Sequence, residues 1–98
     1  MAHLVVAEFW LEPSRLDEAL EALHRALADT RAFDGCLQVD VLAETADPAH
    51  LVVAENWASP EHVAAYRKWR AGDGKLTDLA PLMAASPASD RYTHQPAI

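Results

Sequence analysis

The sequence predicts an α+β sandwich in which helices cover one face of a four-stranded antiparallel sheet. Three observations predict it. Short apolar runs rich in β-branched and aromatic residues mark strands near the start and in the middle of the chain. Amphipathic segments with helical periodicity lie between these strands. The two middle strands are joined by a short link, which favours antiparallel pairing. The order β-α-β-β-α-α-β is that of a ferredoxin-like sandwich.

The first strand is expected at residues 3–11. One face carries Val5, Ala7, Phe9 and Leu11. The other face carries Leu4, Val6 and Trp10, with Glu8 as its only polar member. Both faces of this strand are therefore largely apolar.

A helix of about five turns is expected to follow, because Pro13 and Ser14 suit a helix start. Its apolar stripe is formed by Leu16, Leu20, Leu23 and Leu27. Asp34-Gly35 ends the helical pattern.

Two strands, Cys36–Ala43 and His50–Trp57, are expected to form a hairpin across the turn at residues 44–49. In the first of them, alternation points four side chains inward: Leu37, Val39, Val41 and Ala43. Cys36 is expected to be a small buried apolar residue.

A second helix is expected at Pro60–Ala71, with Ser59 as its N-cap and Glu61 near the positive end of the helix dipole. A third short helix is expected at Lys75–Met83, although Pro81 would kink or end it. Residues 89–95 are expected to form the last strand. We expect one domain over residues 1–98.

Composition narrows the function. The chain is 51% hydrophobic and 23% charged, as in ordinary globular proteins. Its net charge of -7 argues against nucleic-acid and anionic-membrane partners. One cysteine excludes an intrachain disulfide and favours a reducing compartment. With no recognisable secretion signal, a cytoplasmic protein is expected.

The apolar strands predict a partner. Helices can cover only one face of the sheet, yet the strands at residues 3–11 and 50–57 are apolar on both faces. An open apolar face of that size is unusual in a monomer. We therefore expect a homodimer in which two sheets close a barrel-like core.

Two stretches of the sequence form a recognisable pattern. They are Gly-Cys-Leu at residues 35–37, and Glu-Asn-Trp-Ala-Ser-Pro-Glu at residues 55–61, between a hairpin and a helix. In these motifs the chain resembles the antibiotic biosynthesis monooxygenase family. The resemblance covers nearly the whole chain in element order. It implies a dimeric α+β barrel and, for many members, oxygenation of quinols, anthrones or similar polycyclic phenols without a cofactor.

The family has further activities, and this sequence departs from its common pattern. Other relatives degrade haem, isomerise small phosphorylated sugars, or have no assigned reaction. Many members carry a His in the second helix where this chain has Tyr66, and the nearest His here is His62, one turn earlier. Ala7 occupies the place of the Asn that haem-degrading relatives use, which makes haem chemistry unfavourable.

Four residues are candidates for catalysis: Glu55, His62, Tyr66 and Arg70. Glu55 interrupts an apolar run, so its pKa should be raised, as an acid/base group requires. The alternative is a buried structural carboxylate paired with backbone donors or with an arginine such as Arg70 or Arg91. His62 is a second possible base. Tyr66 or Arg70 could hold a phenolate, and a surface ion pair is the alternative for Arg70.

The candidate substrate-binding residues are Phe9, Val53, Trp57, Val63 and Trp69. They are expected to line an apolar pocket between the sheet and the second helix, which would take a flat aromatic molecule. Plain core packing is the alternative, especially for Trp57 and Trp69.

No metal or cofactor is expected. The five histidines, His3, His24, His50, His62 and His94, are scattered, and no nucleotide-binding or nucleophile motif occurs. Three functions remain open: a cofactor-free monooxygenase, a non-redox isomerase or cyclase, and a catalytically silent dimeric binding protein.

Overall fold

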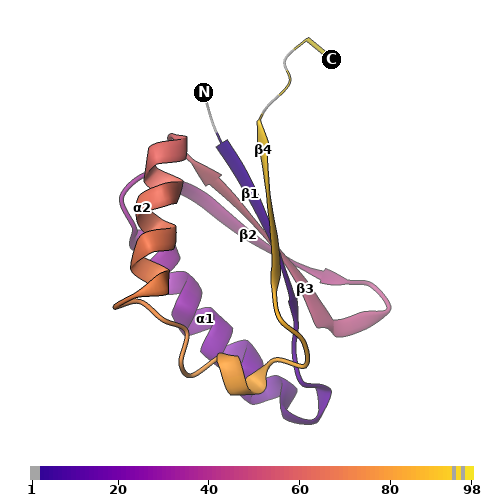
Figure 1. Ribbon diagram of the computed structural model, residues 1–98. Coiled ribbons are helices and arrows are strands. Elements are labelled where there is room, and N and C mark those ends of the chain that lie inside the picture. The colour runs from indigo at the N-terminus through magenta and orange to yellow at the C-terminus, as the bar shows by residue number, and fades with distance from the viewer. Residues whose placement is uncertain (1–2, 94, 96) are drawn as a thin grey trace.

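Four strands form one antiparallel sheet in this computed structural model, which describes residues 3–93, 95, 97 and 98. The strands are β1 (His3–Trp10), β2 (Cys36–Glu44), β3 (Asp47–Trp57) and β4 (Ala88–Thr93), in the spatial order β2-β3-β1-β4. The helices α1 (Leu16–Ala32) and α2 (Pro60–Ala71) lie on one side of this sheet (Figure 1). The predicted ferredoxin-like α+β fold is confirmed.

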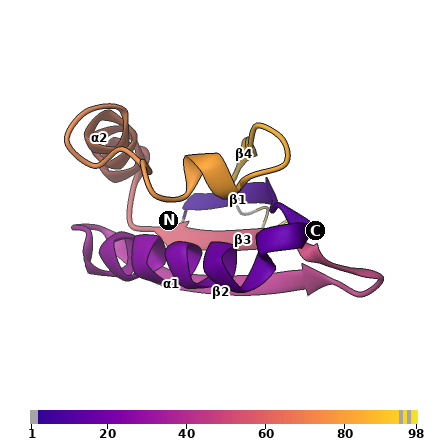
Figure 2. The ribbon, with the colours of Figure 1, turned by 90° about the horizontal axis from the view of Figure 1, so that it is seen from below.

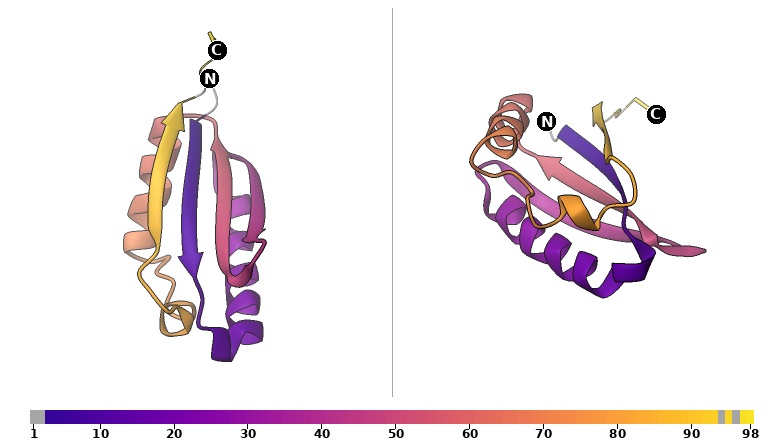
Figure 3. Two further views of the ribbon diagram at one scale, coloured as in Figure 1. Left: turned by 90° about the vertical axis from the view of Figure 1, so that its right-hand side faces the viewer. Right: turned by 60° about the horizontal axis from the view of Figure 1, so that its bottom comes forward.

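The two helices cover different parts of that side. Figure 2 shows α1 running alongside β2 and β3, with α2 apart from it, and the segment after α2 leading back towards β4. The remaining helical turns are 3-10 turns, η1 (Pro13–Arg15) before α1 and η2 (Ala80–Leu82) before β4. The face of the sheet that carries no helix is turned to the viewer on the left of Figure 3.

The register of the sheet places the buried Glu55 carboxylate on the helix-covered face. Val5 of β1 lies opposite Glu55 of β3, and Phe9 lies opposite Leu51. These residues are buried and belong to the helix-covered face, as strand alternation requires. The run from Leu51 to Trp57 therefore points every second side chain towards the helices.

The α1 stripe is shifted from the predicted one. Leu23 and Leu27 are buried, as expected. Leu20, however, is 39% exposed, so its prediction as a core residue was wrong. The buried positions around the two leucines are instead taken by smaller residues, Ala19, Ala22 and Thr30. Small side chains let α1 approach the sheet closely.

Strand β2 is less buried than its alternation suggested. Of the four residues predicted to point inward, only Val39 is buried; Leu37 is 63% and Val41 is 42% exposed, and Ala43 is also exposed. The register shifts between Cys36 and Gln38, and β2 is an edge strand, which explains the exposure. The turn is also shorter than predicted, since β3 already begins at Asp47.

Helix α2 has the predicted bounds, and the Ser59 hydroxyl accepts the backbone N–H of His62 as its N-cap. The predicted third helix is wrong. Only Ala80–Leu82 form a 3-10 turn, because Pro81 lacks the N–H that a longer helix needs there. Leu79 and Leu82 are nevertheless buried.

The last strand, expected at residues 89–95, is Ala88–Thr93; residue 94 lies outside the described residues. Within the described part of the chain, none of the helices is both long and apolar enough to cross a membrane.

Candidate functional site

A cavity of about 200 Å³ lies between α2 and the helix-covered face of the sheet. Five elements meet there: β1, β3, β4, α2 and the segment after α2. The lining residues are Val5, Glu55, Val63, Tyr66, Arg67, Arg70, Leu76 and Ser89. The cavity thus combines apolar walls with one carboxyl group, two guanidinium groups and two hydroxyl groups, as ligand sites commonly do.

Glu55 is the buried acid of this cavity, with only 6% of its surface exposed. Its Oε1 accepts a hydrogen bond of 3.0 Å from Nε1 of Trp57. Among the described residues, no Lys, Arg or His nitrogen lies within 4.0 Å of its carboxylate, so the predicted alternative of a direct Arg70 or Arg91 pair is not formed.

Burial raises the pKa of Glu55 above its ordinary value. The Trp57 hydrogen bond and the charges of Arg67 and Arg70 act in the opposite direction without cancelling that effect. The result is a carboxyl group that can take up and release a proton nearer to neutral pH than a surface glutamate.

Trp57 supports this cavity from behind and does not line it. Its side chain is fully buried at the end of β3, 4.9 Å from the ring of Tyr66 between centroids. Phe33 meets it edge-on at 6.1 Å. Trp57 therefore fixes the Glu55 carboxylate through its N–H while its ring packs beneath α2.

Of the other predicted contact residues, one lines the cavity and the rest lie outside it. Val63 lines the cavity, whereas Trp69 stacks outside it, with Arg70 4.6 Å above its ring. Phe9 and Val53 lie in the larger hydrophobic cluster under α1 and do not line the cavity. The structure thus brings Glu55 and Val63 together with Tyr66 and Arg70, and leaves the other five predicted site residues outside the cavity.

Arg70 is hydrogen-bonded mainly within the fold. Its Nε donates to the Tyr66 hydroxyl at 2.7 Å, and one terminal nitrogen donates to the Gly74 carbonyl at 3.1 Å. The other terminal nitrogen donates to the Ala26 carbonyl at 2.7 Å and to the Thr30 hydroxyl at 3.0 Å. The side chain therefore ties α2 to α1 and to the turn that follows α2.

The same network holds Tyr66. Its hydroxyl shares a hydrogen bond of 2.7 Å with that of Thr30, which is fully buried on α1. Thr30 also donates to the Ala26 carbonyl, at 3.3 Å. The two hydroxyls and Arg70 thus satisfy one another and leave few donors for a ligand.

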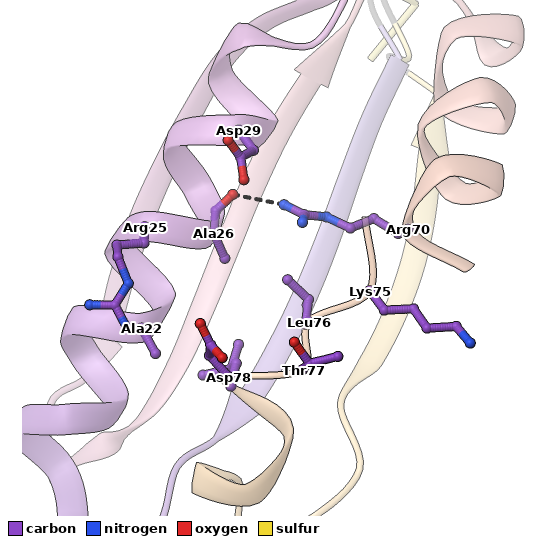
Figure 4. A pocket seen from close by; sticks show the side chains of 10 residues that line it. Ala22, Arg25, Ala26, Asp29, Arg70, Lys75, Leu76, Thr77 and Asp78 are labelled. Atoms are coloured by element: carbon purple, nitrogen blue, oxygen red, sulfur yellow. Dashed lines mark hydrogen bonds between the residues drawn. The ribbon is translucent and has the colours of Figure 1, made fainter. Parts of the chain in front are cut away.

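A second cavity of about 210 Å³ lies on the other side of Arg70, between α1 and the segment after α2. Figure 4 shows Arg70 reaching across it to Ala26, with Leu76 beside it. Arg70 and Leu76 line both cavities and so form the wall between them.

His62 lies away from both cavities, at the start of α2. Its Nδ1 and the Ser59 hydroxyl share a hydrogen bond of 2.6 Å, and its Nε2 is 3.6 Å from Asp34. The ring also packs against Gly35, whose φ of 88° is open to glycine but strained for other residues. His62 thus joins the start of α2 to the turn before β2.

Gly35→Ala should lower the free energy of unfolding by about 2–5 kcal/mol, because a Cβ there adds backbone strain and overpacking. The new Cβ would lie 2.2 Å from Cγ of His62. In a His62→Ala background the loss should be smaller, since only the backbone strain remains. Urea unfolding followed by tryptophan fluorescence measures both values. Equal losses in the two backgrounds would contradict the contact.

Sequence reasoning missed five residues of this region, among them the apolar lining residues Val5 and Leu76. Thr30 could have been found, because it lies three positions after Leu27 on the buried side of α1. Arg67 lies four positions after Val63 on α2 and so shares its side. Ser89 is brought to the cavity only by the pairing of β4 with β1, which no local pattern signals. Among the described residues, no group of three or more His, Cys, Asp or Glu side chains is placed to hold a metal ion.

Solved structures share the whole fold. A conserved protein from Methanosarcina mazei Go1 superposes with a TM-score of 0.83 at 18% identity, over 97% of this chain and 94% of that one. A Mycobacterium tuberculosis protein gives 0.78 at 20% identity, over 97% and 96%. An antibiotic biosynthesis monooxygenase gives 0.81 at 20% identity, over 96% and 99%. At such identities these likenesses show the fold alone.

No curated protein matches this sequence closely enough to be reported as a relative. The sequence model of one family does match, and it spans residues 2–72, from the first strand to the end of α2. That range contains Glu55, Trp57 and all the α2 residues of the cavity. The chain belongs to the antibiotic biosynthesis monooxygenase family.

Proposed function

We propose that this protein is a cofactor-independent monooxygenase that oxidises a quinol- or anthrone-type aromatic compound in the cavity between α2 and the sheet. The observation that carries the proposal is Glu55, a buried carboxyl group with a raised pKa at the wall of an otherwise mainly apolar cavity. Family membership supports the reaction class.

The proposed reaction needs only a base, a site for the anion and a dry enclosure. Glu55 takes the acidic proton of the substrate, and the resulting electron-rich anion reduces dioxygen directly. The carbon and the oxygen then combine to a peroxide. Loss of water from the peroxide leaves a carbonyl group, so one oxygen atom enters the product and the other enters water.

We propose Glu55 as the base in preference to His62, because Glu55 lines the cavity and His62 does not. Tyr66 and Arg70 keep a proposed role in holding the anion, since both line the cavity. Their mutual hydrogen bond makes that role chiefly one of shape and charge.

The size of the cavity bears on the substrate. At about 200 Å³ it is smaller than the roughly 300–1,000 Å³ of typical ligand pockets. This favours a hydroquinone of one or two rings over a tricyclic anthrone as the first compound to test.

Oxygen consumption on such a hydroquinone tests the proposal. The protein should be treated exhaustively with EDTA and shown by absorbance to contain neither flavin nor haem. Steady uptake above the autoxidation rate is expected. Activity that disappears with the chelator and returns with added iron or copper would overturn the cofactor-free mechanism. Proton exchange on a keto substrate without oxygen uptake would indicate the isomerase or cyclase alternative. Activity in neither assay would indicate the catalytically silent binding protein.

We also propose that the protein acts as a homodimer through the helix-free face of the sheet. The register puts Leu4, Val6 and Val52 on that face, and Leu42 and Tyr92 beside them are 56% and 49% exposed. An exposed apolar face of this kind is typical of an interface.

Sedimentation at low micromolar concentration should therefore give about twice the monomer mass of 10.7 kDa. Val52→Glu should shift the protein towards monomer, because a charge in the middle of that face is costly to bury. Glu21→Gln on the exposed side of α1 is the matched control and should leave the mass unchanged. A folded wild-type monomer at this concentration would contradict the proposal.

A further inference from the structure

The polar groups of the cavity differ in how far the fold already uses them. Arg70 makes four hydrogen bonds within the protein. Arg67, one turn earlier on α2, makes one, from a terminal nitrogen to the Ser89 hydroxyl at 2.9 Å. A guanidinium group carries five N–H donors, so Arg67 keeps most of its capacity for another partner.

Among the described residues, Arg67 also forms no ion pair. In the part of the chain that the structure describes, no carboxylate oxygen lies within 4.0 Å of its guanidinium nitrogens. Arg67 and Ser89 are both exposed and both line the cavity, so they stand at its rim. Glu55 is the only acidic residue among the described residues of the lining, and it is buried.

The charge of the lining is therefore opposite to that of the whole chain. The protein carries a net charge of -7, whereas the cavity has two arginines against one glutamate. When Glu55 is protonated, the two positive charges stand alone. A surplus positive charge at the rim of an apolar cavity favours a ligand that is apolar in its body and negative at one end.

We propose that Arg67, with Ser89, forms a subsite that binds a carboxylate or equivalent anionic substituent of the substrate at the rim of the cavity. The substrate class is then an aromatic hydroquinone acid, whose ring lies against Val5, Val63 and Leu76. This inference rests on the proposed function for the location of the site, and it adds the acidic substituent. Arg67 is a specificity residue; it takes no proton and forms no bond in the reaction.

Calorimetric titration with dihydroxybenzoate and with its methyl ester tests the subsite at low ionic strength. Charged hydrogen bonds are roughly twice as strong as neutral ones, so the wild-type protein should bind the acid on the order of tenfold more tightly than the ester. Arg67→Gln should remove this preference, by weakening the binding of the acid. Ser89→Ala should reduce the preference in part.

Lys68→Gln is the matched control, because it removes the same charge from the next residue of α2, which does not line the cavity. It should keep the full preference. Equal binding of acid and ester by the wild type, or a preference that survives Arg67→Gln, would overturn the subsite.

The subsite and the proposed function can be contradicted independently of each other. Oxygen uptake by the wild-type protein on unsubstituted hydroquinone tests the monooxygenase without an acidic substituent on the substrate. Uptake without any preference for the acid would overturn the subsite and keep the monooxygenase. A preference for the acid without uptake would support the subsite and overturn the monooxygenase.

Discussion

Glu55→Gln should lower the rate of oxygen consumption on a hydroquinone by a factor on the order of 10²–10⁴, the usual cost of removing a general base. Glutamine keeps the size of the side chain and can still accept the Trp57 hydrogen bond. The substitution should therefore lower the rate and leave the fold intact. Initial rates with an oxygen electrode, at saturating substrate, measure it.

His62→Ala is the comparison that makes this result specific. His62 is hydrogen-bonded to Ser59 and does not line the cavity, so the rate should change little. If the His62 variant loses the larger factor and Glu55→Gln does not, His62 is the base and the assignment made here is wrong.

The raised pKa of Glu55 also predicts how rate and stability depend on pH. A base must be ionised, so the wild-type rate should rise with pH through the raised pKa. The folded state holds this proton more tightly than the unfolded chain, so stability should fall as pH rises from the unfolded value through the folded one. Denaturant unfolding at several pH values should show this fall in the wild type and not in Glu55→Gln.

Trp57→Ala should lower the free energy of unfolding by about 3–5 kcal/mol, as is usual when a large buried aromatic side chain is removed. Trp57 is fully buried and meets Phe33 and Tyr66, so its loss leaves a cavity beneath α2. Urea unfolding followed by circular dichroism measures this change without relying on tryptophan fluorescence.

Trp57→Phe separates packing from hydrogen bonding. It keeps most of the ring volume but removes the N–H that Glu55 accepts, so the loss of stability should be smaller than for alanine. The pKa of Glu55 should rise further, because that hydrogen bond lowers it. If the dependence of the rate on pH has the same midpoint in Trp57→Phe as in the wild type, the coupling between the two residues is contradicted.

Local patterns in the sequence were sufficient for much of the fold. Ser59 followed by Pro60 predicted the start of α2, and Leu23 with Leu27 predicted the buried side of α1. Glu55 within an apolar run predicted a buried carboxylate. Each of these inferences depends on residues a few positions apart, where periodicity and capping act.

The failures lie where distant segments decide the outcome. Leu76, Leu79 and Leu82 have a helical spacing, but Pro81 and packing in the hydrophobic cluster keep this segment from forming an α-helix. Val41 alternates like a core residue, yet β2 is an edge strand and leaves it exposed.

The same limit applies to the site. The contacts of Arg70 with Ala26 and Thr30 join positions at least 40 residues apart. The approach of Ser89 to Arg67 depends on where β4 pairs. Neither contact has a signature in the local sequence. The different hydrogen bonding of Arg67 and Arg70 is therefore visible only in the structure.

The most direct measurement is a crystal structure of the protein with a bound hydroquinone acid. The ring is expected to lie in the cavity between α2 and the sheet, with a hydroxyl group within hydrogen-bond distance of Glu55 and the carboxylate on Arg67. A ring bound instead between α1 and the segment after α2, or on the helix-free face of the sheet, would contradict this expectation.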